Sequence, residues 1–166
     1  MNEVYRWSRD SDLEEIKKLL ITCFGDNANT NAYDNIDGRY LLCLVNGKIV
    51  AMSGLCHKSN ISPDAVEITW TCTHPDYRHQ GIMQNLFEKL LNTTNQDIYC
   101  YCWKIGDKSF VNLHDLMDIY GFEKIKSNLN EKENKICPNA SKEKCAYYNE
   151  NCKCCEDLFL RKGIIK

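Results

Sequence analysis

Three segments of the chain space their apolar residues as one face of a helix does. In the first, apolar side chains recur three and four positions apart, at Leu13, Ile16, Leu19, Leu20, Cys23 and Phe24. The sequence Ser11-Asp12-Leu13-Glu14 has the capping-box pattern that opens helices. The second helix is predicted directly after Gly81, with one apolar face made of Ile82, Met83, Leu86, Phe87, Leu90 and Leu91. A third is predicted at about 109–119, with Gly121 as its left-handed cap.

Strand patterns occupy the intervening segments in the first half of the chain. Residues 3–8 alternate weakly between polar and apolar side chains and are expected to form a first strand. Residues 40–45 and 48–52 flank the pair Asn46-Gly47, which supplies the two positive φ angles of a type I′ turn. The two runs therefore predict a β-hairpin.

A second group of strand patterns surrounds the second helix. Residues 66–73 alternate between apolar and polar side chains, and residues 98–103 form a short apolar run. Because two parallel strands need a crossover helix between them, residues 66–103 predict a βαβ unit. Residues 158–160 are expected to form a last strand, and the polar segment 25–38 a loop with a short helix. Glu67, Thr69, Thr71 and Thr73 are expected to share the polar face of the strand at 66–73.

Composition and charge narrow the class of protein. The length of 166 residues suits one domain, 1–166. With 21 Lys and Arg against 23 Asp and Glu, the net charge is −2, so the chain has no global basic field for nucleic acid. No apolar run approaches the ~20 residues that span a bilayer, and the first residues lack the layout of a secretory signal. We therefore expect a soluble, cytoplasmic protein without nucleic-acid or membrane partners.

The turn between the alternating strand and the second helix has the features of an anion-binding site. The first amides of a helix have no partners within the helix and carry the positive end of its dipole. Gly81 lets the backbone approach a phosphate because it has no Cβ, and Arg78 adds a charged donor. The alternative is an ordinary strand-to-helix turn that contains a glycine.

Residues 75–82, Pro-Asp-Tyr-Arg-His-Gln-Gly-Ile, follow a strand that carries a glutamate and precede an amphipathic helix. In this context they resemble motif A of the GNAT N-acetyltransferase superfamily, whose pattern is Arg/Gln-x-x-Gly-x-Gly/Ala. Arg78 and Gly81 match that pattern, and Met83 stands where Gly or Ala is usual. The order of elements over residues 1–125 is similar to the family layout. The resemblance implies an α/β (α+β) fold, with a mixed, mostly antiparallel twisted sheet and helices on both faces.

The same resemblance implies a cosubstrate, acetyl-CoA, and the residues that hold it. Its pyrophosphate would lie on the backbone of residues 79–83 with Arg78. Backbone amides near Cys72 and Thr73, where the strand splays, would stabilise the oxyanion of the reaction. Asn112 matches an asparagine that often bonds the pantetheine arm, unless it only starts a helix. The expected cofactor-binding residues are therefore Cys72, Thr73, Arg78, His79, Gln80, Gly81, Ile82, Met83 and Asn112.

Acetyl transfer to an amine needs a base, because an ammonium group is not a nucleophile. Several relatives use a strand glutamate that acts through water, and Glu67 stands at that position; the alternative is a solvated carboxylate. His114 is a second candidate base. Relatives often protonate the departing thiolate with a tyrosine where this chain has Met117. Tyr120 is the remaining candidate acid, unless it only packs and the thiolate, whose conjugate thiol has a pKa near ~8.5, leaves into water.

Eleven cysteines are an unusual number for this length, and five of them lie in the polar stretch 126–156. Cys137, Cys145, Cys152 and Cys154 supply enough thiolates for a tetrahedral zinc site. The stretch resembles a Cys-rich extension that some GNAT proteins carry before the last strand. Free or redox-active thiols, or cysteines without a role, are the alternatives.

Together these observations predict an acyltransferase, an N-acetyltransferase that moves acetyl from acetyl-CoA to an amine of a small molecule or peptide. The reaction would proceed by direct attack in a ternary complex. A non-catalytic acyl-CoA-binding or regulatory module and a zinc-organised interaction domain are the alternatives. The sequence does not identify the acceptor, and it leaves open whether the protein is a homodimer.

Overall fold

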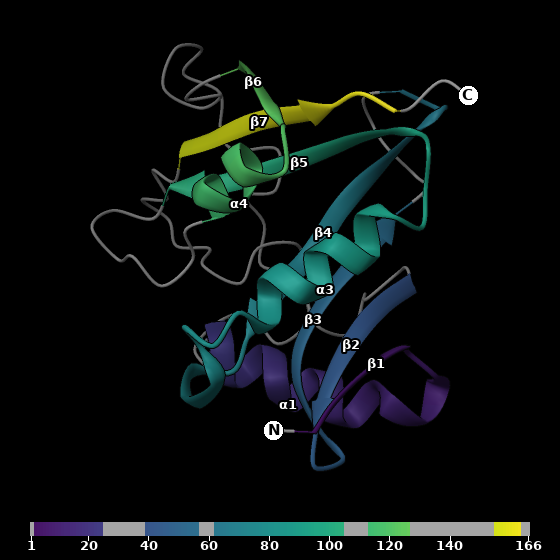
Figure 1. Ribbon diagram of the computed structural model, residues 1–166, viewed down its shortest axis with the longest axis vertical. Coiled ribbons are helices and arrows are strands. Elements are labelled where there is room, and N and C mark those ends of the chain that lie inside the picture. Colours follow the sequence, from purple (N-terminus) through teal and green to yellow (C-terminus); the bar gives the residue numbers. More distant parts are fainter. Residues whose placement is uncertain (1, 25–38, 57–61, 105–112, 127–154, 164–166) are drawn as a thin grey trace, which may run out of the picture.

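Figure 1 shows the fold of the protein in a computed structural model, which describes residues 2–24, 39–56, 62–104, 113–126 and 155–163. In chain order the elements are β1 (Glu3–Trp7), α1 (Leu13–Phe24), β2 (Arg39–Val45), β3 (Lys48–Cys56), β4 (Ala65–Thr73), α3 (Ile82–Leu91), β5 (Asp97–Lys104), α4 (Leu113–Ile119), β6 (Glu123–Lys126) and β7 (Cys155–Arg161). The expected loop at 25–38, the helix start at 109–112 and residues 127–154 of the Cys-rich stretch lie outside the described residues.

The described strands form one seven-stranded sheet in the order β1-β2-β3-β4-β5-β7-β6. In this sheet β4 and β5 are parallel, and the other neighbouring pairs are antiparallel. α3 connects the parallel pair, as a crossover requires. Asn46 and Gly47 have φ angles of 51° and 82°, which are the positive values of the predicted hairpin turn. The predicted mixed, mostly antiparallel sheet is therefore confirmed.

Helices cover both faces of the sheet. The apolar face of α1 packs on side chains of β2 and β3 that include Leu42 and Met52. The apolar face of α3 packs on side chains from the opposite face, including Leu41 and Val50, and the helix crosses in front of the strands in Figure 1. Because successive side chains of a strand point to opposite faces, the apolar run of β2 supplies both cores.

The start of α1 differs from the prediction. A 3₁₀ turn, Asp10–Asp12, precedes the helix, and the side chain that closes it belongs to Asp12 rather than Ser11. Its Oδ2 accepts a hydrogen bond from the backbone N–H of Arg9 at 2.7 Å. Leu13, expected on the buried face, is 42% exposed. The capping-box pattern predicted the wrong cap because Asp12 also pairs with Arg6, a partner on β1 that the local motif does not include.

The end of α4 has the predicted glycine cap. Gly121 has a φ angle of 71°. The Phe122 amide donates to the Met117 carbonyl at 2.9 Å, and the Gly121 amide donates to the Asp118 carbonyl at 3.3 Å. These two bonds make a Schellman motif. The motif turns the chain into β6, whose four side chains are all exposed. No apolar alternation marks that strand, so the sequence did not predict it.

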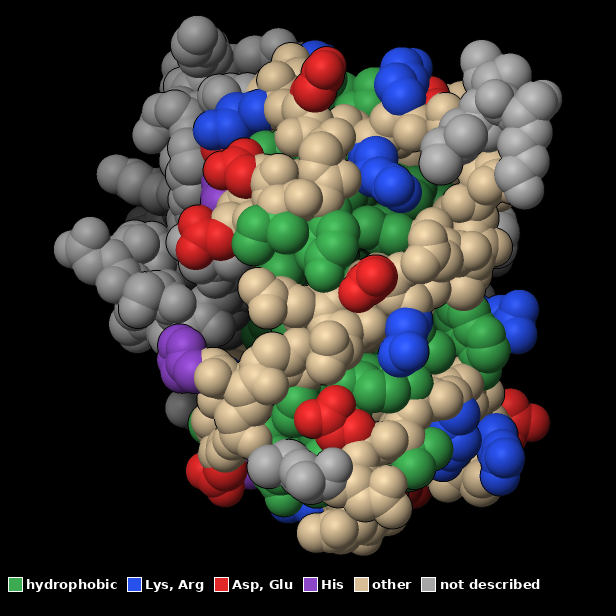
Figure 2. All heavy atoms as spheres, in the orientation of Figure 1, with side chains coloured by type: hydrophobic (Ala, Val, Ile, Leu, Met, Phe, Trp, Pro, Cys, Tyr) green, Lys and Arg blue, Asp and Glu red, His purple; other side chains and the backbone are tan. Residues whose placement is uncertain are grey.

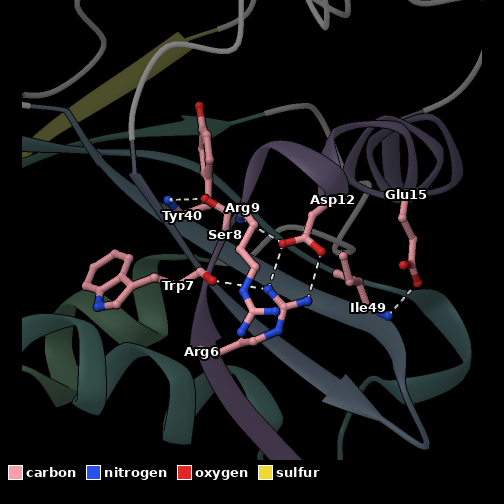
Figure 3. Close-up of polar contacts among 8 residues, drawn as sticks. All are labelled: Arg6, Trp7, Ser8, Arg9, Asp12, Glu15, Tyr40 and Ile49. Carbon is pink, nitrogen blue, oxygen red and sulfur yellow. Dashed lines mark hydrogen bonds and ion pairs between the residues drawn. The ribbon is translucent and has the colours of Figure 1, made fainter.

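A polar joint fixes the first turn of α1 to the sheet, as Figure 3 shows. Nη1 and Nη2 of Arg6, on β1, donate to Oδ2 and Oδ1 of Asp12 at 2.6 and 2.8 Å. This bidentate geometry, with two parallel N–H···O bonds, is the strong form of an ion pair. Glu15 Oε1 accepts from the backbone N–H of Ile49, on β3, at 2.7 Å. The helix is therefore tied to strands on either side of β2.

Charged side chains of both signs are mixed on the face seen in Figure 2. Lys and Arg lie among Asp and Glu there, with hydrophobic side chains between them, so the described residues of this face make no continuous basic surface. Within the described ranges, no helix has the length and apolar character that crossing a bilayer requires.

Asp12→Asn is expected to destabilise the protein at pH 7 by about 2 kcal/mol. The hydrogen-bonded Arg6 guanidinium, helped by the Arg9 amide, lowers the pKa of Asp12 to about 2. The unfolded value is ~3.9, so the ionised carboxylate stabilises the fold above about pH 4, and this contribution is lost as the pH falls towards 2.

Urea unfolding between pH 2 and 7 measures the effect. The difference between wild type and Asp12→Asn should narrow as the pH falls below about 4. Asp10→Asn, which removes an exposed carboxylate of the same 3₁₀ turn, is the matched control. A difference that stays constant over the whole range would contradict the assignment.

Candidate functional site

The sheet divides between β4 and β5. The two strands pair from Ala65 with Asp97 as far as Ile68 with Cys100. From there β4 stays with β3, whereas β5 pairs with β7 as far as Lys104. Figure 1 shows β4 and β5 diverging. Because the facing edges are no longer paired with each other, their backbone groups can bind a ligand.

A β-bulge lies in β4 at this opening. Two residues, Trp70 and Thr71, stand opposite the single residue Ser53 of β3. Trp70 has a φ angle of 47°, a left-handed value that is uncommon outside glycine. Its ring packs edge-on against Phe24 of α1 with centroids 6.0 Å apart, and the buried hydroxyls of Thr71 and Ser53 are 2.8 Å apart. These contacts on both sides of the sheet stabilise the bulge.

The bulge reverses the faces that the β4 side chains occupy. Before it, Ile68 packs in the core beneath α3. After it, Cys72 packs in the core beneath α1, although an unbroken strand would place both on one face. The predicted face shared by Glu67, Thr71 and Thr73 is therefore wrong. The extra residue in β4 shifts the alternation by one, and the sequence pattern does not record it.

The turn after β4 contains two residues with left-handed backbone. It follows the 3₁₀ turn Pro75–Tyr77, and His79 and Gly81 have φ angles of 59° and 77°. If a Cβ were added at Gly81, its nearest heavy atom among the described residues would be 4.0 Å away. The space over the turn is therefore open. Nε of Arg78 donates to the Thr73 carbonyl at 3.1 Å. The turn is thereby fastened to the end of β4.

α3 begins directly after this turn. The first hydrogen bond of the helix runs from the Asn85 amide to the Gly81 carbonyl and is 3.0 Å long. The amides of residues 82–84 therefore do not donate to the hydrogen bonds of the helix itself. Ile82 and Leu86 are 1% and 0% exposed, and their burial fixes the direction of the helix. The positive end of the helix dipole therefore points into the open space above the turn.

A cavity of about 690 Å³ joins this turn to the end of β4 and to the flanking helices α1 and α4. Seven of the predicted cofactor-binding residues line it: Cys72, Thr73, Arg78, His79, Gly81, Ile82 and Met83. Gln80 is not among the lining residues, and its Nε2 donates to the Asp76 carbonyl at 3.1 Å. A second hollow, of about 750 Å³, is lined by residues of β1 and α3, and it contains none of the predicted residues.

The two helices also bring residues that the sequence analysis did not name as part of a site. Cys23 and Phe24 come from the last turn of α1, and Leu113, Asp115 and Leu116 come from α4. Both helices are amphipathic, and their apolar residues were expected only to pack on the sheet. Nothing in a helical apolar pattern distinguishes a core position from the wall of a cavity.

Cys23 and Cys72 belong to the same apolar core and both line the cavity, and each residue is 8% exposed. A hydrogen bond with Cys72 lowers the pKa of Cys23, and the positive charge of Arg78 acts in the same direction. The same hydrogen bond, together with burial, raises the pKa of Cys72.

Glu67 and Tyr120 are not among the residues that line the cavity. Glu67 is half-buried in β4, one residue before the last parallel pair with β5, and its register partners are Cys56 and Tyr99. The Tyr120 hydroxyl donates to the Gln84 carbonyl at 2.8 Å, and burial raises its pKa. That contact ties the end of α4 to α3.

His114 anchors α4 to the sheet. Its Nε2 lies 3.1 Å from Oδ2 of Asp157, a fully buried carboxylate of β7, and Nζ of Lys124 on β6 lies 3.0 Å from the same oxygen. The ring also packs edge-on against Phe159. Met117 is completely buried on the same helix. The remaining predicted site residues lie outside the described ranges: Asn112, Cys137, Cys145, Cys152 and Cys154.

Comparison with known proteins gives a family and a fold. The sequence matches the model of the acetyltransferase (GNAT) family over residues 1–111. A search of curated proteins found no match. Three similar solved structures are an aminoglycoside 6'-N-acetyltransferase in complex with coenzyme A, the ribosomal-protein-S18-alanine N-acetyltransferase from Escherichia coli and a GNAT acetyltransferase from Bacillus cereus.

The three structural similarities extend over nearly the whole of each chain. The aminoglycoside enzyme has a TM-score of 0.66 and 10% identity, with 98% of both chains covered. The Escherichia coli enzyme has a TM-score of 0.67 and 12% identity, covering 99% of this chain and 96% of its own. The Bacillus cereus protein has a TM-score of 0.65 and 15% identity, covering 99% and 100%. The TM-scores show a common fold, and because the identities are this low, the similarity shows the fold alone.

Thr71→Val is expected to destabilise the protein by about 1–3 kcal/mol, because the near-isosteric valine leaves the buried Ser53 hydroxyl without its partner at the bulge. The double variant Ser53→Ala/Thr71→Val removes both hydroxyls and should recover most of the loss. Urea denaturation of wild type, Ser53→Ala, Thr71→Val and the double variant measures this. A double variant as unstable as the sum of its two single changes would show that the hydrogen bond does not stabilise the bulge.

Proposed function

The chain belongs to the acetyltransferase (GNAT) family, and we propose that it transfers the acetyl group of acetyl-CoA to an amine of a small molecule or peptide. The observation that carries the proposal is the cavity of about 690 Å³, in which the Gly81 turn, the start of α3 and the opened end of β4 meet. One side of that cavity suits a phosphate, and the other suits a reacting carbonyl group.

The residues of the turn fit the pyrophosphate of acetyl-CoA. The amides of residues 82–84 have no place in the helical ladder, and a negative charge is stabilised where they point. Gly81 leaves the approach open, and Arg78 lines the same cavity. In this proposal the cosubstrate binds by its phosphates at the start of α3, with its thioester towards the opening between β4 and β5.

The end of β4 fits the developing oxyanion. Beyond Ile68, the β4 edge that faces β5 is released from the parallel ladder, so backbone N–H groups there are available to an oxygen atom. In this proposal the amides near Cys72 and Thr73 stabilise the negative charge on the acetyl oxygen. The Thr73 carbonyl accepts from Arg78, so the strand end and the phosphate turn are held as one unit.

In the proposed reaction the amine attacks the acetyl carbon directly, and the thiolate of coenzyme A leaves. Glu67 accepts the amine proton through water; it is half-buried and adjoins the last paired residues of β4 and β5. Met117 stands at the position of the usual acid, and its thioether has no acidic proton to donate. The residue is also fully buried. Tyr120 remains the proposed acid only if its hydroxyl leaves the Gln84 carbonyl. Otherwise the thiolate leaves into water, which a thiol pKa of ~8.5 permits.

For the acceptor, we propose only its chemical class, an amine. Two structural neighbours are named for such acceptors, an aminoglycoside and the alanine of ribosomal protein S18. Asp115, at the start of α4, is an exposed carboxylate that lines the cavity, and its charge favours an approaching cation. A cytoplasmic location and the absence of nucleic-acid and membrane partners stay predictions from the sequence, which leaves open whether the protein is a homodimer.

The zinc proposal also rests on the sequence. Cys137, Cys145, Cys152 and Cys154 have the number and type of side chains for a tetrahedral site, and they lie outside the described residues. Among the described residues, no group of three or more metal-binding side chains comes together. A zinc site would therefore belong to the Cys-rich stretch.

Two measurements on the full chain test the proposed function. Calorimetric titration with coenzyme A measures binding, and mass spectrometry of products after incubation with acetyl-CoA and a panel of amines measures transfer. Binding together with one acetylated amine supports the proposal. Binding without transfer to any amine would favour a non-catalytic acyl-CoA-binding module, for which the buried Met117 is the supporting observation. Absence of binding would contradict both.

Gly81→Val is expected to weaken acetyl-CoA binding by at least ~1–3 kcal/mol, the scale of a lost buried phosphate–amide contact. A branched side chain does not readily adopt a φ angle of 77°, and it would fill the open space over the turn. Gly47→Val is the matched control, because Gly47 has a φ angle of 82° in a hairpin turn that does not line the cavity.

The control separates backbone strain from loss of the phosphate site. Both variants should lose stability, whereas coenzyme A binding, measured by titration at a temperature where both are folded, should weaken only in Gly81→Val. Wild-type affinity in folded Gly81→Val would overturn the pyrophosphate assignment.

Glu67→Gln is expected to lower turnover and leave the affinity for acetyl-CoA nearly unchanged, because an amide of similar shape cannot accept the amine proton. Initial rates from pH 6 to 9 measure the effect, with the same amine at a saturating concentration. His114→Gln is the comparison variant for the second candidate base. A wild-type pH–rate profile in Glu67→Gln would assign the proton to another group.

A further inference from the structure

We propose that the acceptor amine carries a second positive charge, which binds the aromatic side chains of Trp70, Tyr99 and Tyr101 on the face of the sheet opposite α3. The acceptor is then a diamine or polyamine rather than a neutral alkyl amine. The transfer step rests on the proposed function, whereas binding of the cation is measured without it.

The alternation of side chains places Glu67, Tyr99 and Tyr101 on one face of the sheet. The core beneath α3 takes every second residue of the two strands β4 and β5: Val66, Ile68, Ile98, Cys100 and Cys102. The residues between them therefore point to the opposite face. Glu67 and Tyr99 are register partners in the parallel pair, in which neighbouring strands lie about 4.8 Å apart, and Tyr101 follows about 6.6 Å further along β5.

The bulge in β4 brings Trp70 to this face as well. An unbroken strand would place residue 70 with Ile68 beneath α3. Instead, the ring of Trp70 packs on Phe24 and on the core beneath α1. Its φ angle of 47° is a strained value for a bulky side chain, and such residues cluster at ligand sites, where bulges redirect side chains. Strain and bulge together thus present an aromatic ring beside Glu67.

Trp70 and Tyr101 stand on the two strands that separate at the opening. The parallel pairing ends two residues before Trp70 on β4 and one residue before Tyr101 on β5. Phe24, the ring partner of Trp70, lines the cavity, and so does Cys72, two residues further along β4. The aromatic side chains therefore border the opening on the side where α1 ends.

The cosubstrate and the acceptor need different approaches to this opening. In the proposed function the phosphates lie at the start of α3, and α3 and α4 pack on the same side of the sheet. Figure 1 shows α3 in front of the strands. Of the described α-helices, only α1 packs on the other side. An amine that attacks the acetyl carbon therefore approaches from the side that carries Glu67 and the three aromatic residues.

The chemistry of this surface favours a cation. Trp70, Tyr99 and Tyr101 are half-buried, and Glu67 is half-buried among them. The faces of aromatic rings attract ammonium groups, and a neighbouring carboxylate attracts them further. A neutral alkyl chain would gain only the burial of its methylene groups on the same rings. The surface thus selects a molecule that is still a cation after its reacting nitrogen has lost a proton.

The two nitrogens of such an acceptor have different parts in the reaction. One loses a proton and attacks: its N–C bond to the acetyl carbon forms, and the C–S bond of acetyl-CoA breaks. Two protons leave this nitrogen in all, one of them by way of Glu67; one ends on the sulfur of coenzyme A and the other in the solvent. The second nitrogen stays an ammonium group on the aromatic rings. The product is a mono-acetylated diamine.

The first test compares three primary amines of equal chain length on the full chain: putrescine, aminobutanol and aminobutyl-trimethylammonium. The alcohol replaces the second ammonium with an uncharged polar group, and the quaternary compound keeps the charge without N–H donors. Both cations should have a kcat/KM about tenfold above that of the alcohol, the scale of a cation–π contact, after correction for the two equivalent nitrogens of putrescine.

Two outcomes of this comparison would overturn the proposal. Equal kcat/KM for putrescine and aminobutanol would show that the second charge is not recognised. A quaternary compound as poor as the alcohol would show that N–H donors, rather than ring faces, bind the second nitrogen.

Variants assign the preference to the rings. In Tyr101→Leu and Trp70→Leu the preference for putrescine over aminobutanol should fall towards one, whereas Tyr101→Phe, which keeps the ring, should retain it. Tyr5→Leu is the matched control, because Tyr5 is a partly buried tyrosine that packs on the α3 side of the sheet. A preference unchanged in both folded leucine variants would contradict the assignment, and Tyr101→Leu decides alone if the strained position 70 does not tolerate leucine.

Calorimetric titration with putrescine in the presence of coenzyme A distinguishes this inference from the proposed function. If no amine is acetylated but putrescine binds, and Tyr101→Leu weakens that binding, the aromatic site stands and the proposed function fails. If aminobutanol is acetylated as readily as putrescine, the proposed function stands and this inference fails.

Discussion

One extra residue in β4 decides how the candidate site is built. The bulge at Trp70 puts residues before it and residues after it into opposite cores, and it lies where β4 leaves β5. A regular strand would have kept Cys72 with Ile68 under α3, with the polar residues 67, 69, 71 and 73 in one row. The bulge instead turns Cys72 towards α1. The place of Cys72 in the cavity wall follows from this change.

The cavity needs elements from four parts of the chain, so its geometry depends on how firmly each is fixed. α1 is fixed at its first turn by Arg6, Asp12 and Glu15, and its last turn supplies Cys23. α4 is fixed by the buried Asp157, which His114 and Lys124 share. α3 is fixed by its apolar face and by the Tyr120 hydroxyl. Polar contacts at helix ends thus position apolar walls.

Much of the fold could be predicted because its signals are local. Asn46 and Gly47 specify their turn by backbone sterics, and the prediction is confirmed by their positive φ angles. Gly121 closes α4 for the same kind of reason. The strand-to-helix turn at Gly81 was predicted for a related reason, since a strand, an arginine, a glycine and a helix follow each other within a few residues. In contrast, the cap of α1 was mispredicted because Asp12 has a partner on β1.

The sequence by itself determined the described helices, every described strand except β6, and the parallel pair joined by a helix. Through the residues around Gly81 it also indicated the family of the chain. It did so because periodicity, glycine conformation and helix starts each depend on residues a few positions apart. Only the tertiary structure decided which face Glu67 and Cys72 occupy, that α1 supplies Cys23 to the cavity, and that His114 binds Asp157. These depend on a bulge and on contacts between residues far apart in the chain, and the energies that select them arise only when the sheet and helices pack together.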